Sequence, residues 1–174
     1  RSYSSCTQYR ENVVDARRSL RDAGAADVEI TYVRDWHLTD GFIEANAANI
    51  RTALETLPAD VRDEAEIVFT AHSIPLSMAQ RYPYERQIRE SAQAVIEILG
   101  RGGWHLVYQS RSGRPEDPWL EPDVCDFLRG TARRGARAIV LCPIGFVSDH
   151  IEVLYDLDVE AANVARELGL PLAR

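Results

Sequence analysis

The sequence predicts an α/β fold with a four-stranded parallel sheet and helices on both faces. Two observations predict it. Helical and strand-like segments alternate along most of the 174 residues, and the strand-like runs are short and rich in β-branched or apolar residues. No internal repeat or low-complexity linker interrupts the pattern. Since helices that join parallel strands form right-handed crossovers, we expect residues 1–174 to form a single layered domain.

The first expected elements are a helix, a strand and a second helix. A helix with an apolar face is predicted near residues 8–23, where Gly24 offers a stop. Residues 28–33 alternate with a period of two and are expected to form the first strand. A second helix follows from about residue 39 and ends before Pro58.

The later elements repeat this alternation. Strands are expected at residues 66–70, 104–108 and 138–142, and helices near residues 85–99, 123–134 and 150–168. The polar segment 109–122 is longer than a usual strand-to-helix connection, and long ordered loops often carry function.

Composition and charge exclude several classes of function. The net charge of −7 argues against nucleic-acid binding, which depends on clustered positive charge. No stretch reaches the roughly 20 apolar residues of a membrane span, and no signal peptide opens the chain. The three cysteines are odd in number and lack CxxC spacing, so we expect no disulfide framework and a cytoplasmic location.

Polar side chains follow two of the predicted strands. His72 comes after residues 66–70, and Asp149, His150 and Glu152 follow residues 138–142. Open parallel sheets bind ligands beyond the carboxyl ends of their strands, and imidazole with carboxylate suits a divalent metal and protons. Alternatively, His72 only caps its strand by hydrogen bonds, and Asp149 is only a helix N-cap.

Glu152, Asp156 and Glu160 are spaced by four residues and share one helix face. A solvated acidic face is the simplest explanation of such a run. The position of this face at a strand's carboxyl end favours a second interpretation, in which the carboxylates form a path for metal or protons.

The long loop carries further candidates. Trp119 and Tyr108 belong to the core or form a wall for a flat macrocycle. Ser110 and Arg111 have two interpretations: they bind an anionic substituent of a ligand, or they are solvated loop residues.

Four motifs together resemble the ferrochelatases, lyases that insert ferrous iron into a porphyrin in haem biosynthesis. They are FTAHSIP at 69–75, YQSR at 108–111, PWLEP at 118–122 and PIGFVSDHIEVLYD at 143–156. Residues 2–10 resemble the actinobacterial branch, whose members act on coproporphyrin III. The resemblance implies a Rossmann-like, chelatase-type fold, with ferrous iron and a porphyrin as substrates.

The resemblance also implies roles for single residues. His72 matches the family's active-site histidine and Glu152 its partner glutamate; both are the expected catalytic groups and iron ligands. Asp156 and Glu160 match an acidic relay for protons or metal. The expected porphyrin-binding residues are Tyr9, Ser110 and Trp119.

The resemblance also bears on an iron–sulfur cluster. Cys6 matches a cysteine that ligates a [2Fe-2S] cluster in some actinobacterial members. The other three ligands would lie in a C-terminal tail that these 174 residues lack, and Cys125 and Cys142 do not fit their pattern. This argues against a complete cluster in this chain.

The family has two similar α/β domains, and residues 1–174 resemble the second, C-terminal half. The N-terminal half would supply the other wall of the porphyrin pocket, so we expect the 174 residues alone to be inactive or barely active. Two alternatives stay open. One is a cobalt or nickel tetrapyrrole chelatase, for which a second histidine would be wanted where Glu152 stands. The other is a non-catalytic α/β ligand-binding module.

Overall fold

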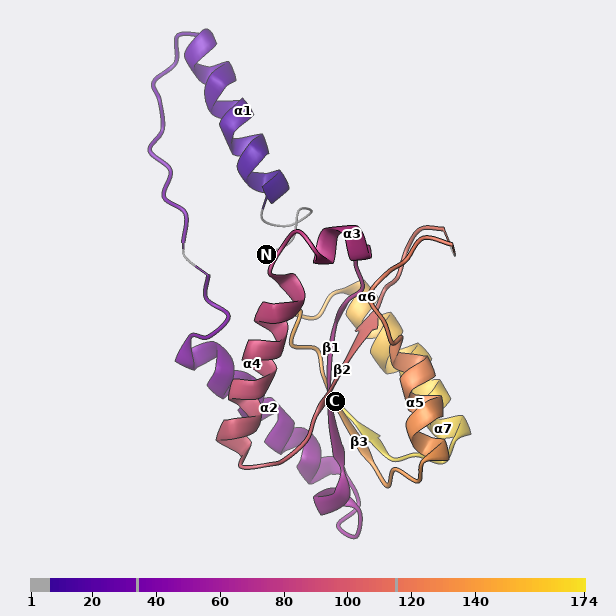
Figure 1. Ribbon diagram of the computed structural model, residues 1–174. Helices are drawn as coiled ribbons and strands as arrows, with labels where there is room; N and C mark the ends of the chain where they lie inside the picture. Colours follow the sequence, from indigo (N-terminus) through magenta and orange to yellow (C-terminus); the bar gives the residue numbers. More distant parts are fainter. Residues whose placement is uncertain (1–6, 34, 115) are drawn as a thin grey trace.

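A parallel sheet forms the centre of the computed structural model, which describes residues 7–33, 35–114 and 116–174 (Figure 1). All strand pairs are parallel, in the order β2-β1-β3-β4. The strands are β1 (Glu66–His72), β2 (His105–Gln109), β3 (Ile139–Cys142) and β4 (Leu172–Ala173). The expected four-stranded parallel α/β fold is therefore confirmed, although one strand is not the one predicted.

Helices cover both faces of this sheet (Figure 1). The first face packs against α2 (Asp40–Thr56) and α4 (Tyr84–Leu99), with the short α3 (Leu76–Ala79) above them. The second face packs against α5 (Val124–Arg133) and a helical stretch made of α6 (Ile151–Val153), η3 (Leu154–Ala161) and α7 (Ala162–Glu167). A short 3₁₀ turn, η2 (Arg62–Glu64), precedes β1.

The strand period of two decides which side chains meet which layer. Phe69 and Ala71 of β1 enter the core beneath α2 and α4, whereas Val68 enters the core beneath α5 and η3. Because successive strand side chains point to opposite faces, Thr70 and His72 share the face of Val68. His72 therefore lies on the side of the sheet that η3 covers.

The prediction of a strand at residues 28–33 is wrong. This segment is extended but pairs with no strand among the described residues, and Val28, Tyr32 and Val33 are 53%, 44% and 80% exposed. The preceding helix α1 (Gln8–Asp22) buries none of its side chains and stands away from the sheet (Figure 1). Apolar alternation alone cannot make a strand where no neighbouring edge is available for hydrogen bonds.

The fourth strand, β4, was not foreseen. It has only two residues and pairs through Ile139↔Leu172 and Val140↔Ala173. A segment this short carries no readable period.

Within the described ranges, no helix combines the length and apolar character that crossing a bilayer requires.

Candidate functional site

His72 is the last residue of β1 and lies opposite Gln109 of β2 in the sheet register. Its Nδ1 is hydrogen-bonded to the backbone carbonyl of Ser73. Since a carbonyl can only accept, Nδ1 carries the proton and donates. With Nδ1 donating, the tautomer with a single ring proton has its lone pair on Nε2, which can bind a metal ion or accept a proton.

The backbone around His72 is held by contacts from three directions. The hydroxyl of Tyr84, at the start of α4, donates to the His72 carbonyl at 2.9 Å. Burial raises the pKa of Tyr84, so this phenol stays a donor at every physiological pH. Ser73 donates from its amide to the Gln109 carbonyl at 2.8 Å and from its hydroxyl to the Leu120 carbonyl at 2.8 Å. His72 is consequently presented by a fixed loop.

The loop that follows β3 reaches the same edge of the sheet. The amide of Gly145 donates to the carbonyl of Thr70 at 3.0 Å, so this loop crosses the carboxyl end of β1. It leads directly to His150 and Glu152, where α6 begins. The fold thus brings the two predicted patches to one edge, although they are about 80 residues apart in the sequence.

Glu152 lies at the open side of this edge. Its carboxylate is 54% exposed and is 3.9 Å from Nδ1 of His150, whose ring packs edge-on against Phe146. Neighbouring apolar side chains are also exposed: Val147 by 75% and Ile151 by 77%. Polar groups framed by exposed apolar ones suit an amphipathic ligand or another part of a larger protein.

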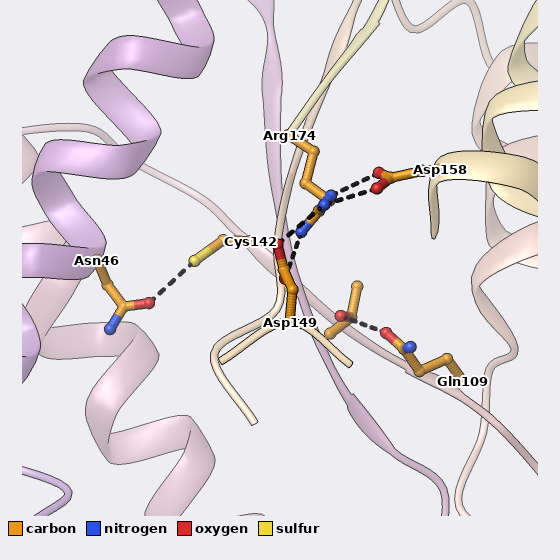
Figure 2. A network of polar contacts seen from close by, with 7 residues as sticks. Asn46, Gln109, Cys142, Asp149, Asp158 and Arg174 are labelled. Atoms are coloured by element: carbon orange, nitrogen blue, oxygen red, sulfur yellow. Dashed lines mark hydrogen bonds and ion pairs between the residues drawn. The ribbon is translucent and has the colours of Figure 1, made fainter. Parts of the chain in front are cut away.

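Asp156, one turn further along, is hydrogen-bonded to residues at the carboxyl end of β2. It accepts hydrogen bonds from the hydroxyl of Ser110 and, at 3.3 Å, from Nε2 of Gln109. Oε1 of Gln109 in turn accepts from the Thr70 hydroxyl at 2.8 Å (Figure 2). This buried chain connects the face that carries His72 to the helix that carries the acidic residues.

Asp156 and Glu160 line one cavity of about 380 Å³ together with Ser110, Asp123 and Cys125. They lie on η3, a π-helix with i→i+5 hydrogen bonds, a form that is often found at functional sites. His72 and Glu152 are not among the residues that line this cavity. Across the described ranges, no three His, Cys, Asp or Glu side chains are grouped closely enough to hold a metal ion.

The other predicted site residues are dispersed. Tyr9 lies on α1, is 67% exposed and is not brought to the sheet. Trp119 lies beside the loop after His72, because it forms an antiparallel bridge with Pro75. Its ring packs so closely on Gly113 that a Cβ there would be 2.9 Å from the indole.

The two described cysteines, Cys125 and Cys142, do not form a cluster site. Cys142 is buried beneath α2 and contacts Asn46 at 3.4 Å (Figure 2). Cys125 packs against the core on the opposite face of the sheet. These two thiols therefore cannot ligate one cluster, and Cys6 lies outside the described residues. Among the described residues, the cysteines therefore do not fit a [2Fe-2S] group.

Three residues that contact the candidate site carry no signal in the sequence. Thr70 and Gln109 are buried polar residues inside apolar strands, and only the sheet register makes them partners. Arg174 binds Asp149 and Asp158. Asp149 is consequently not the helix N-cap, a position that His150 occupies without a side-chain capping bond.

A wider groove of about 980 Å³ runs along α3 and α4, between Leu38 and Trp104. None of the candidate residues lines it. This groove is larger than the cavity that contains Asp156, but the candidate residues lie at the carboxyl edge, where parallel sheets bind ligands. The candidate site is therefore the smaller cavity with the exposed patch around Glu152.

The fold and these contacts define a class: a Rossmann-like α/β protein whose ligand edge carries an imidazole and several carboxylates. The ferrochelatase family model matches residues 1–174, and the chain belongs to the ferrochelatase family.

Curated relatives agree with this assignment. The chain is 45% identical over 175 residues to a coproporphyrin III ferrochelatase from Mycobacterium sp. (strain KMS) and 46% identical over 188 residues to one from Streptomyces coelicolor. It is 48% identical over 173 residues to a ferrochelatase from Rhodopirellula baltica. In each comparison 99% of this chain is covered, but the chain spans only about half the length of the relative, at 50%, 50% and 48%.

Proposed function

We propose that this chain is the C-terminal half of an enzyme that inserts ferrous iron into coproporphyrin III, and that it supplies the His72 and Glu152 wall of the active site. Family membership is the observation that carries the proposal. The names of the curated relatives support the substrate. The common carboxyl edge reached by the β1 and β3 loops supports the site.

The chemistry of the reaction fits the groups at this edge. Two pyrrole N–H protons must leave as the ferrous ion, a substrate, enters the macrocycle. Nε2 of His72, with Nδ1 engaged by Ser73, serves as the base or as a weak metal contact. Glu152 is its carboxylate partner, and the cavity containing Asp156 and Glu160 gives displaced protons or the incoming metal a polar route.

We also propose that the full-length protein contains an N-terminal half in addition to these 174 residues. The relatives are about twice as long as this chain. Exposed apolar side chains on residues 28–33 and beside Glu152 are surfaces that a further domain would cover. We therefore expect porphyrin insertion from the full-length protein, and turnover by residues 1–174 at full-length rates would refute the need for a second half.

The test is a turnover assay on the full-length protein with coproporphyrin III and Fe²⁺, followed by the Soret band. We expect His72→Ala and Glu152→Gln each to lower kcat at least about 100-fold while the protein still binds porphyrin. His105→Ala is the matched control. That imidazole lies at the amino end of β2, where it pairs with Glu66 at 3.1 Å. Unchanged turnover of the His72 variant at saturating iron would remove this residue from the chemistry.

The same assay separates the alternatives. Faster insertion of Co²⁺ or Ni²⁺ than of Fe²⁺ would indicate a related tetrapyrrole chelatase. A Soret shift on porphyrin binding without any metal insertion would indicate a non-catalytic binding module. Comparison of coproporphyrin III with protoporphyrin IX assigns the porphyrin.

A further inference from the structure

Arg174 joins two acidic residues that flank the candidate carboxylates (Figure 2). Its Nε and Nη2 donate to the two oxygens of Asp158 at 2.6 and 2.7 Å. Its Nη1 and Nη2 donate to the two oxygens of Asp149 at 2.8 and 3.3 Å. One guanidinium therefore makes a bidentate contact with each of two carboxylates, a geometry that Arg provides and Lys does not.

The three members come from separate parts of the fold. Arg174 directly follows β4, whose pairing of Ala173 with Val140 of β3 fixes its backbone to the sheet. Asp149 lies in the loop between β3 and α6, three residues before Glu152. Asp158 lies on η3, two residues after Asp156. The contact thus ties both ends of the segment 149–158 to one edge of the sheet.

We propose that Arg174 is a positioning residue, which fixes the direction in which the segment 149–158 presents Glu152 and Asp156 to the substrate. This inference rests on the proposed function of that segment. At the start of the segment, His150 makes no side-chain capping bond, and the first side chain buried in the core is Val153, four residues after Asp149. The Arg174 side chain is 21% exposed, so its ion pairs are less screened than those of a fully solvated arginine.

Loss of the guanidinium would also leave two carboxylates facing each other. Both acids lie within hydrogen-bonding distance of the same group, so without it they repel. The segment would then relax outward and carry Glu152 with it. A displacement of about 1 Å at a reacting group is enough to lower a rate by about 100-fold.

The experiment compares Arg174→Gln, Arg174→Lys and Arg137→Gln in the full-length protein. Arg137 is the matched control, since it makes longer ion pairs with Asp60 at 3.9 Å and Glu64 at 3.5 Å on the surface. We expect Arg174→Gln to lower kcat about 10- to 100-fold with little change in the porphyrin Kd, as loss of an outer contact to a metal-handling group does. Arg174→Lys should recover part of this loss, and Arg137→Gln should stay within about twofold of wild type.

Amide hydrogen exchange supplies a readout that needs no activity. We expect exchange in residues 149–153 to rise at least about tenfold in Arg174→Gln, while β1 is unchanged. Unchanged exchange, or turnover within about twofold of wild type despite faster exchange, would overturn the proposal. If the wild-type protein inserts no metal, the proposed function fails, and exchange alone then decides whether Arg174 holds this segment.

Discussion

Gly145 lies directly against Ala71. A Cβ on Gly145 would be 2.7 Å from the Ala71 Cβ and 2.8 Å from its Cα, closer than real atoms approach. The β3–α6 loop can therefore cross the end of β1 only because position 145 has no side chain. This close approach brings the loop of His150 and Glu152 to the strand that ends in His72.

The first prediction concerns this approach. Gly145→Ala should lower the free energy of unfolding by about 1–3 kcal/mol, because the new methyl group meets backbone that cannot move away. Urea unfolding of the full-length protein measures the change. Gly41→Ala is the control: a Cβ there has nothing within 4 Å, and its place in α2 favours alanine. Equal effects of the two substitutions would contradict the steric argument.

The second prediction concerns the buried chain from Thr70 to Asp156. The Thr70 hydroxyl donates a hydrogen bond to Oε1 of Gln109, and Thr70→Val removes this donor. The Gln109 oxygen then loses its partner in a side chain that is only 1% exposed. The expected cost in the free energy of unfolding is about 1–3 kcal/mol. Thr70→Ser keeps the hydroxyl and should cost clearly less. If serine and valine are equally destabilising, packing of the methyl group, not the hydrogen bond, is what matters at position 70.

The third prediction concerns the start of α5. The Asp123 carboxylate accepts hydrogen bonds from the amides of Cys125 and Asp126, at 2.8 and 3.3 Å. Asp123→Ala should destabilise the protein by about 1 kcal/mol, whereas Asp123→Asn should keep most of the capping contact. Thermal and urea unfolding measure both variants. An alanine variant as stable as the asparagine variant would show that the cap contributes nothing.

The fourth prediction concerns thiol reactivity. Burial raises the pKa of Cys142 to about 12. The pKa of Cys125 is raised to about 11, mainly by burial and to a smaller extent by the negative charge of Asp123. Only the thiolate reacts, so at pH 8 about one Cys125 side chain in 1,000 is reactive. Alkylation by iodoacetamide, mapped by peptide mass, should be slow for both residues and rise about tenfold per pH unit at Cys125.

The same shifts have a consequence for stability at high pH. The folded pKa of Cys142 lies above the unfolded value of about 8.5, so the folded state holds the proton more tightly. Its contribution to stability is complete below about pH 8.5 and is lost as the pH rises toward about 12.

The control for the alkylation experiment is the unfolded protein: in 6 M guanidinium both thiols should react at ordinary rates. Rapid labelling of either residue in the folded protein at pH 7 would contradict this account.

The elements with long, regular patterns were the predictable part of the fold. The helices α2, α4 and α5 and the strands β1, β2 and β3 lie within a few residues of their predicted positions. The helices repeat an apolar period, and β1 and β3 are short, nearly continuous buried runs. Residues 28–33 alternate with a period of two but have no strand to pair with in the part of the chain that the structure describes. Local sequence fixes the tendency to extend, whereas pairing depends on what lies beside the segment.

The candidate site was predictable only in outline. His72 and Glu152 stood out because they follow apolar strands, and the fold brings their loops to one edge. The partners that hold them did not stand out. Gln109 reads as an ordinary strand end, and Arg174 follows a two-residue strand. Such contacts depend on register and on distances across the sheet, which spacing along the chain does not encode.

The unpaired segment at residues 28–33 also affects how the 174-residue chain behaves in a test tube. The Val28 amide donates to the Asp27 carboxylate, but residues 29–33 pair with no strand within the described ranges, so their backbone forms an open template that a second copy can join edge to edge. Preparations of this polypeptide by itself should therefore self-associate as concentration rises, and a soluble tether or a charged substitution at Val33, which is 80% exposed, should keep them monodisperse.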